Sequence, residues 1–315
     1  MHPLGMPPPV SRRTLLRQAA AVAAALVLPA PVLACGGAPT GKRTSPGDTD
    51  RERLASWTKQ LASEGLTRRE LPLGRSVARV GDLAAGSPYE PFTLEAYLKN
   101  GGSPVTEPLT LSLTRFDCVT LVEACLAVSR AAATQSPGWD EFGREVERMR
   151  YRDGKRHGYT SRLHYFSEWI SDGARRGLVQ DLGAELGGAA DGRPLRFMTE
   201  HRAKYSALQD DGVFQEIHRI ERELDARPRR VIPTKQIPQV VERIQTGDVL
   251  AFATEIAGLD VTHSALAYRD DAQVLRVLHA PLSGGVVEVT RATLPEYVAA
   301  IRHATGILVA RPLRA

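Results

Sequence analysis

The pattern of apolar positions divides the chain into a helical part and a strand part. Up to residue 227, apolar residues recur at intervals of three and four positions, as on the buried face of an amphipathic helix. From Ile244 the interval changes to two, as in strands that bury one face. Helices followed by a series of short strands predict an α+β fold with an antiparallel sheet.

The helical part contains several segments with a clear apolar face. The predicted helices cover residues 51–64, a segment that begins at Cys118, a segment around residues 142–149, about ten residues from Phe166, and residues 202–227. The last of these is strongly charged and turns four apolar residues inward, Val213, Ile217, Ile220 and Leu224. Its charges are therefore expected to form a solvated face. Residues 180–200 are rich in Gly and Asp and predict a loop.

The strand part predicts a meander of short strands. The expected strands cover residues 249–253, 261–268, 273–280, 285–290 and 306–310. The second and third are joined by a tight turn at Asp270–Asp271, which makes them antiparallel neighbours. Folding the chain about that turn puts residue 263 opposite about residue 278, so we expect His263 to lie beside His279.

The N-terminal segment has the features of an export signal. Arg12 and Arg13 form a twin-arginine pattern, and residues 19–28 are an apolar run too short to span a bilayer. Residues 32–35 resemble the lipobox of bacterial lipoproteins, which would make Cys35 the lipidated first residue of the mature protein. Plain cleavage after Ala34 is the alternative. Residues 1–34 are thus predicted to be a signal peptide.

The mature protein is expected to be a periplasmic domain held at a membrane by its lipid. Residues 35–50 form a polar tether, and residues 51–315 form a single domain. After the signal, no run of about 18 apolar residues remains to span a bilayer. The signal carries three of the 41 basic residues and no acidic one, which leaves 38 basic against 36 acidic residues. This near-neutral balance and the absence of a nucleic-acid motif argue against nucleic-acid binding.

Cys118 is the candidate nucleophile. It follows Asp117, whose carboxylate is suited to cap the N-terminus of the predicted helix. The partial positive charge at that helix end favours a thiolate. Cys125 lies further along the same helix, too far from Cys118 for a disulfide, and is expected to pack in the core as a small apolar residue.

Two histidines can complete the chemistry of a cysteine nucleophile. A general base needs a further group that orients its ring, and His279 beside His263 can provide one. One of the two could instead be a hydrogen-bonded core residue. Cys118, His263 and His279 could in principle also hold zinc, but the ligand spacings typical of zinc sites are missing. We expect neither a metal nor another cofactor.

Several motifs, in fixed order, resemble the NlpC/P60 cell-wall cysteine peptidases, and more closely the DUF1460 family. In chain order the motifs are Gly86-Ser87-Pro88-Tyr89, Phe116-Asp117-Cys118, Tyr151-Arg152-Asp153-Gly154, Ser161 to Phe166, Phe197-Met198, Gly247-Asp248-Val249, Gly258 to Ala265, Leu278-His279-Ala280 and Gly306-Ile307. The resemblance runs from about residue 77 to residue 311. It implies a papain-like fold, with the nucleophile at a helix N-terminus packed on the antiparallel sheet and a helical insertion at about residues 140–240. It also implies an N-acetylmuramoyl-L-alanine amidase that acts on muropeptides.

The resemblance assigns roles to individual residues. Cys118 would be the nucleophile, His263 the base and His279 the orienting residue, with Tyr89 beside the oxyanion site. The chain departs from the family at Pro281-Leu282, where a small polar pair is usual, so substrate contacts of this loop differ. Tyr159, Ser161, Arg162 and His164 would line the cleft, with Arg162 suited to a stem-peptide carboxylate, or would form a hydrogen-bonded structural turn.

Two other functions remain open at this point. The same three residues could cut a γ-D-glutamyl–diamino acid bond, as many NlpC/P60 relatives do. A lipid-anchored protein that binds muropeptides without catalysis is the second alternative, although a binder has no need of Cys118, His263 and His279 together. In each case the expected partners are peptidoglycan fragments and a membrane, and the expected state is a monomer.

Overall fold

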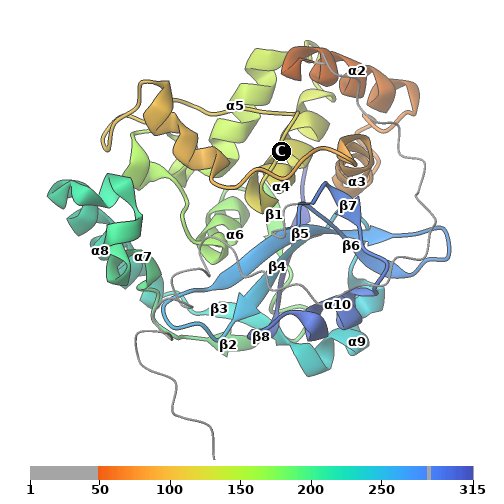
Figure 1. Ribbon diagram of the computed structural model, residues 1–315. Coiled ribbons are helices and arrows are strands. Elements are labelled where there is room, and N and C mark those ends of the chain that lie inside the picture. The colour runs from red at the N-terminus through yellow and green to blue at the C-terminus, as the bar shows by residue number, and fades with distance from the viewer. Residues whose placement is uncertain (1–48, 282–284, 315) are drawn as a thin grey trace, which may run out of the picture.

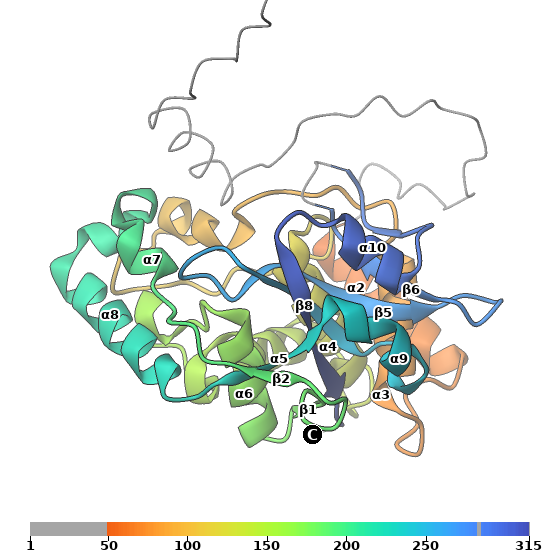
Figure 2. The same ribbon diagram turned by 90° about the horizontal axis from the view of Figure 1, so that it is seen from below.

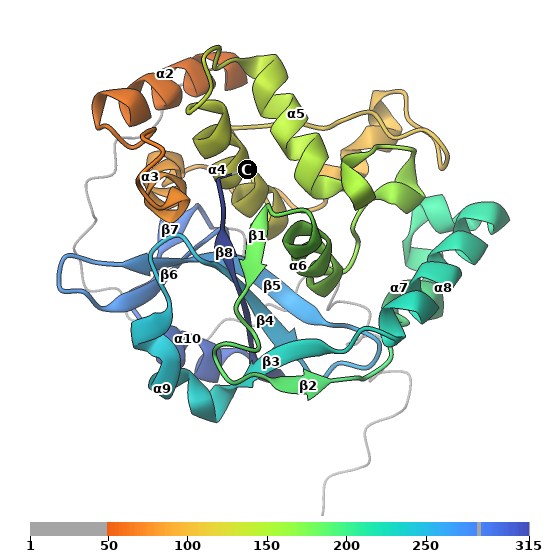
Figure 3. The same ribbon diagram turned by 180° about the vertical axis from the view of Figure 1, so that it is seen from behind.

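The computed structural model describes residues 49–281 and 285–314. Its helices pack on both faces of one sheet (Figure 1). The predicted signal peptide, Cys35 and nearly all of the predicted tether lie outside the described residues. Helices α2 to α6 cover one face of the sheet, and the short α9 and α10 cover the other (Figures 1, 2 and 3). No helix in the described part of the chain is long and apolar enough to cross a bilayer.

The helices over the first face are α2 (Asp50–Ser63), α3 (Leu73–Ala84), α4 (Cys118–Ala131), α5 (Trp139–Arg150) and α6 (Phe166–Arg175). Four of these five match the predicted helices, and α3 is additional. The starts agree because capping is local: Thr49 and Asp117 each accept the backbone N–H of the third helical residue. The remaining helices are α7 (Phe197–Glu200), α8 (Asp211–Asp225), α9 (Ile237–Val240) and α10 (Leu294–Ala300).

Shorter 3₁₀ turns connect the helices, and in one place they replace a predicted helix. They are η1 (Thr93–Asn100), η2 (Arg152–Gly154), η3 (Tyr159–Ser161), η4 (Arg202–Lys204), η5 (Ser206–Gln209), η6 (Thr234–Gln236) and η7 (Val241–Arg243). The prediction of one helix over residues 202–227 was wrong in its first third. Helix α8 begins only at Asp211 because the Asp210 carboxylate caps it, accepting the Val213 N–H at 2.9 Å. The predicted inward residues of α8 are buried.

The strands form one antiparallel sheet in the order β2-β3-β8-β4-β5-β6-β7, with β1 pairing to β8. Their bounds are β1 Val179–Asp181, β2 Ala189–Asp191, β3 Arg229–Pro233, β4 Val249–Thr254, β5 Val261–Arg269, β6 Leu275–His279, β7 Glu288–Val289 and β8 Ala304–Pro312. The predicted α+β class is confirmed. Residues 180–200 are not a plain loop, because they contain strands β1 and β2 and helix α7.

The last strand lies in the centre of the sheet rather than at the end of a meander. Strand β8 pairs with β4 on one side and with β3 on the other. Every residue of β4 is buried, as expected for a strand covered on both faces. Its residues alternate between two cores: Val249, Ala251 and Ala253 face the α2–α6 side, and Leu250 and Phe252 face the α9 and α10 side.

The hairpin of β5 and β6 has a different register from the predicted one. Leu278 pairs with Leu266, not with residue 263. The turn is longer than Asp270–Asp271, because the Val274 backbone oxygen accepts the Asp270 N–H at 3.1 Å and Gln273 adopts a φ of 62°. Continued by one position, this register puts His279 opposite Ala265. His263 and His279 are therefore diagonal neighbours on one face rather than an opposed pair.

Candidate active site

The start of α4 is fixed by a capping box around Asp117. The Asp117 carboxylate accepts the Thr120 N–H at 2.8 Å, and the Thr120 hydroxyl accepts the Asp117 N–H at 2.9 Å. The Thr93 hydroxyl donates to the other carboxylate oxygen, which ties η1 to the helix start. These contacts hold Cys118 at the first helical position.

The Cys118 side chain is partly accessible, and protein surrounds most of it. Burial, with a smaller contribution from the Asp117 carboxylate, raises the pKa of the thiol to about 11. The backbone N–H and hydroxyl of Ser264 act in the opposite direction. The predicted thiolate is therefore not the resting form at neutral pH, because burial disfavours the charged thiolate and the carboxylate that caps the helix offsets the helix dipole.

His263 and His279 come together as predicted. Nε2 of His263 lies 2.9 Å from Nδ1 of His279, and the rings meet edge to face with centroids 5.2 Å apart. Both side chains are buried. A β-bulge opposite Phe252 and Ala253 leaves Thr262 as the extra residue beside His263, and such bulges re-aim side chains near sites.

Both imidazoles are neutral in the folded protein. Burial lowers the pKa of His263 to about 3, with a further contribution from His279, and burial alone lowers the pKa of His279 to about 4. Nδ1 of His263 is buried and has no hydrogen-bond partner among the described residues. A neutral ring with one nitrogen held and the other free is suited to accept a proton.

Tyr297 on α10 belongs to this cluster, and the sequence analysis missed it. Its hydroxyl lies 3.2 Å from Nδ1 of His279, and its ring packs edge-on against the same imidazole. Phe252 stacks on His263 from strand β4, with ring centroids 5.7 Å apart. We call His263, His279 and Tyr297 the imidazole cluster. No local signal marks Tyr297, because α10 reaches the histidines only through its packing on the sheet.

Tyr89 lies close to Cys118, as its predicted place beside the oxyanion site requires. Burial raises the pKa of Tyr89 to about 12, with additional contributions from the Cys118 and Asp117 side chains. The pKa of Tyr297 is raised by burial and then by Cys118, so the thiol lies near both phenols. Tyr89 is held by its backbone, which donates to the Gly285 carbonyl at 3.0 Å and bridges to Phe116.

The residues predicted to line the cleft make their contacts with other residues of the same chain. The Arg162 guanidinium is buried, lies 2.9 Å from Glu95 and 3.4 Å from Glu107, and stacks over Tyr97 and Tyr159. We call these five residues the arginine cluster. Ion pairing with Glu107 and Glu95 raises the pKa of Arg162 against the effect of burial. The geometry favours the structural alternative for Arg162, and its contact with substrate stays a prediction.

The neighbours of Arg162 are also hydrogen-bonded within the chain. The Ser161 hydroxyl donates to the Gly158 carbonyl at 2.7 Å, and Nε2 of His164 lies 2.8 Å from the Tyr159 carbonyl oxygen. Burial and the nearby Arg162 hold the pKa of His164 well below its usual value. Tyr159 itself is buried, so this turn keeps its polar groups inside the fold more than it exposes them to a ligand.

Asp260 fixes the start of β5, and the sequence analysis did not single it out. Its carboxylate accepts the backbone N–H of Ser167 at 2.8 Å and that of Val261 at 2.8 Å. Because Ser167 lies in the first turn of α6, the carboxylate also meets the positive end of that helix. The strand that carries His263 is thereby joined to the helical layer.

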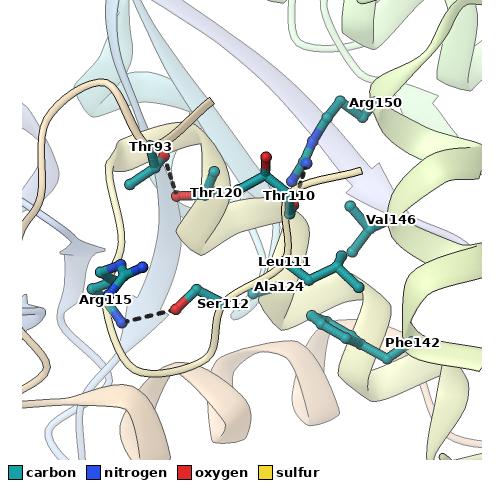
Figure 4. A pocket seen from close by; sticks show the side chains of 10 residues that line it. All are labelled: Thr93, Thr110, Leu111, Ser112, Arg115, Thr120, Ala124, Phe142, Val146 and Arg150. Carbon is teal, nitrogen blue, oxygen red and sulfur yellow. Dashed lines mark hydrogen bonds between the residues drawn. The ribbon is translucent and has the colours of Figure 1, made fainter. Parts of the chain in front are cut away.

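A small cavity lies between α4, α5 and the segment that precedes α4 (Figure 4). It measures about 20 Å³ and is lined by Thr93, Thr110, Leu111, Ser112, Arg115, Thr120, Ala124, Phe142, Val146 and Arg150. This is room for about one water molecule. None of the predicted nucleophile and base residues lines it. Among residues 49–281 and 285–314, no three His, Cys, Asp or Glu side chains converge on a point that could hold a metal ion.

Comparison with known proteins identifies relatives that share this arrangement of elements. The chain is similar to the crystal structure of an N-acetylmuramoyl-L-alanine amidase from Bacteroides uniformis, with 30% identity and a TM-score of 0.69, over 76% of this chain and 99% of that one. A structure described as a putative xylanase from Bacteroides fragilis is 32% identical with a TM-score of 0.67, over 74% of this chain and 98% of that one.

A third structure, from Legionella pneumophila, shares the fold at 17% identity with a TM-score of 0.57, over 82% of this chain and 94% of that one. No curated protein sequence matches the chain. The model of the AmiA-like family, described as N-acetylmuramoyl-L-alanine amidase-like, matches residues 79–307, which include Tyr89, Cys118, His263 and His279. The chain therefore belongs to the AmiA-like, N-acetylmuramoyl-L-alanine amidase-like family.

Proposed function

We propose that this protein is a cysteine-dependent N-acetylmuramoyl-L-alanine amidase that cleaves the bond between the lactyl group of N-acetylmuramic acid and L-Ala in muropeptides. The observation that carries the proposal is the free Nδ1 of buried, neutral His263, whose other nitrogen is held by His279. The residue after His263, Ser264, contacts the Cys118 thiol. Membership of the amidase-like family supports the substrate class.

The first half of the reaction forms a thioester. Nδ1 of His263 takes the thiol proton as Sγ of Cys118 attacks the lactyl carbonyl carbon, so no stable thiolate is needed beforehand. The negative charge on the carbonyl oxygen meets the Cys118 backbone N–H, which has no partner within the helix, and the Tyr89 hydroxyl. The C–N bond then breaks, and His263 returns the proton to the amine of L-Ala.

The second half hydrolyses the thioester. His263, neutral again, takes a proton from water as the water oxygen attacks the same carbonyl carbon. The C–S bond breaks, the proton returns to Sγ of Cys118, and the lactyl carboxylic acid leaves. Burial keeps His263 neutral at the start of each half-reaction, which is the form that can accept a proton from the thiol and then from water.

The proposal includes a papain-like NlpC/P60 fold and a place in the cell envelope. Helix α4, with Cys118 at its start, packs on β5, which carries His263, and this is the arrangement expected of that fold. Export by the twin-arginine signal and acylation of Cys35 would hold the domain at the periplasmic face of a membrane. Treatment of the producing cell with globomycin should then leave a precursor. A soluble, unmodified mature protein would contradict the anchor without affecting the amidase.

The test of the reaction is mass spectrometry of products from a defined muropeptide. The amidase releases the intact stem peptide with a free L-Ala amine and leaves the sugar with a lactyl carboxylate. Cleavage between γ-D-Glu and the diamino acid would instead replace this proposal with the endopeptidase. Tight binding without any product, in protein whose Cys118 is shown to be reduced, would contradict catalysis.

A further inference from the structure

The hydrogen bond between the two histidines leaves open which ring carries the shared proton. Each neutral imidazole has one N–H. In one arrangement Nε2 of His263 donates to Nδ1 of His279, which leaves Nδ1 of His263 free and puts the proton of His279 on its Nε2. In the other, Nδ1 of His279 donates, and His263 carries its proton on Nδ1. Only the first arrangement lets His263 act as a base through Nδ1.

Glu288 is the charged residue that distinguishes these arrangements. It lies directly opposite His279 on the neighbouring strand β7, and its Oε1 is 3.9 Å from Nε2 of His279. A carboxylate at that place favours a proton on Nε2 of His279. The Glu288 side chain is about half exposed, so the attraction is modest. Two tautomers of one neutral ring differ little in energy, so a modest attraction shifts their populations.

Tyr297 faces the opposite nitrogen of the same ring. Its hydroxyl is 3.2 Å from Nδ1 of His279, and its ring meets the imidazole edge-on at 5.2 Å between centroids. With Nδ1 unprotonated, the phenol donates to it beside His263. Burial, the Cys118 side chain and Glu288 raise the pKa of Tyr297, which keeps this donor protonated. The charged and titratable groups around His279 are thus His263 from β5, Glu288 from β7 and Tyr297 from α10.

We propose that Glu288 and Tyr297 are positioning residues for the reaction: Glu288 draws the proton of His279 to Nε2, and Tyr297 holds the ring. Together they keep Nδ1 of His263 free for the thiol proton. The role in catalysis rests on the proposed function, whereas the tautomer is a property of the folded protein. The two parts can therefore be tested separately.

The tautomers are measured first, without any substrate. Long-range ¹H–¹⁵N correlation spectra of the mature protein, labelled with ¹⁵N-histidine, report which nitrogen of each ring carries the proton. We expect an Nε2–H form for His263 and for His279. Glu288→Gln removes the charge and keeps the shape, and it should give a mixture of forms at both rings. A wild-type protein with the proton on Nδ1 of His279 would overturn the proposal.

The kinetic test follows with a matched control. Glu288→Gln should lower kcat about two- to fivefold with KM unchanged, since losing a half-exposed charge shifts the tautomers only modestly and only molecules with a free Nδ1 on His263 react. Glu255→Gln is the control, because Glu255 also contacts a histidine, Nδ1 of His303 at 2.7 Å, away from the site. Glu255→Gln should leave kcat and the signals of the His263 and His279 rings unchanged. Tyr297→Phe should lower kcat several-fold, again with KM unchanged.

Two further measurements separate a positioning role from a structural one. In a His279→Ala background, Glu288→Gln and Tyr297→Phe should have no additional effect on kcat, because both act through His279. The acid limb of kcat/KM should move to lower pH in Glu288→Gln, since a carboxylate favours the protonated imidazole. Independent, additive losses would overturn the proposal. Tautomers that shift as expected in a protein without amidase activity would contradict the proposed function alone.

Discussion

The arginine cluster and the imidazole cluster are both buried polar groups, but the cost of burying a charge is reduced in a different way in each. In the arginine cluster, burial is offset by ion pairs from Arg162 to Glu95 and Glu107 and by two tyrosine rings. In the imidazole cluster, burial is met by loss of charge, and Nδ1 of His263 has no partner within the part of the chain that the structure describes. The arginine cluster also contains buried polar atoms without a hydrogen-bond partner among the described residues, such as the Tyr97 hydroxyl, but its basic group is held by two carboxylates. The imidazole cluster differs because the atom left unpaired is the basic nitrogen of a neutral ring, and this is where chemistry is expected.

The largest effect should come from the thiol beside the imidazole cluster. Cys118→Ser should lower kcat by at least about 10³-fold with little change in thermal stability, because the nucleophile is lost and the packing is not. Cys125→Ser is the control: its side chain is fully buried in the core, so the variant should lose stability and keep activity per folded molecule. The opposite result, with Cys125 required and Cys118 dispensable, would mean that the other thiol is the nucleophile.

The arginine cluster should respond in stability rather than in activity. Arg162→Ala should lower the free energy of unfolding by about 3–5 kcal/mol, because buried Glu107 loses its ion-pair partner. Arg79→Ala breaks a partly exposed pair with Glu64 and should cost less than about 1 kcal/mol. Urea unfolding of both variants measures the difference. A stable Arg162→Ala protein with a raised KM for muropeptides would restore the predicted role of Arg162 as a substrate contact.

The imidazole cluster should make stability depend on pH. The folded pKa values of about 3 for His263 and about 4 for His279 lie below the ordinary 6.5 of an unfolded histidine. Between about pH 6.5 and 4 the unfolded chain therefore binds protons that the folded chain does not, and stability falls as pH falls. Above about pH 6.5 this contribution is fully present, and its loss by pH 4 is on the order of a few kcal/mol.

The contribution of the two histidines is tested by measuring the free energy of unfolding across this pH range for the wild type and for His279→Asn. The variant removes one of the two groups, so it should show a shallower dependence. Equal slopes in the two proteins would show that other groups govern the acid sensitivity.

Replacing His279 should lower the rate substantially and leave substrate binding largely unchanged. His279→Ala should lower kcat less than Cys118→Ser does, because an orienting residue transfers no proton to substrate. His279→Asn should recover part of the loss, since its amide oxygen can accept the N–H of His263. Steady-state kinetics of the two variants, with metal analysis of the purified proteins, measure this. A stoichiometric zinc released on mutation would contradict the cysteine mechanism.

Local features of the chain were predictable where the physics is local. Helix α4 begins where Asp117 can cap it, and its start needs only residues within one turn. The prediction over residues 202–227 failed for a related reason, because the cap at Asp210 starts α8 later than the apolar spacing suggests. The contact of the two histidines was predicted with a wrong register. The contact itself is present, because the side chains of diagonal neighbours on one face of a hairpin are also within reach of each other.

The sequence by itself determined the α+β order of elements, the helix start that carries Cys118, and the hairpin that joins His263 to His279. Only the tertiary structure decided the protonation of these groups, since a pKa depends on what covers the side chain and on which charges face it. It also placed Tyr297 and Glu288 at His279, through the packing of α10 and the pairing of β7. It also paired Arg162 with Glu95 and Glu107, which lie more than fifty positions away along the chain. Charges that are so far apart in sequence meet only when the chain is folded, and the pattern of apolar positions does not indicate which of them pair.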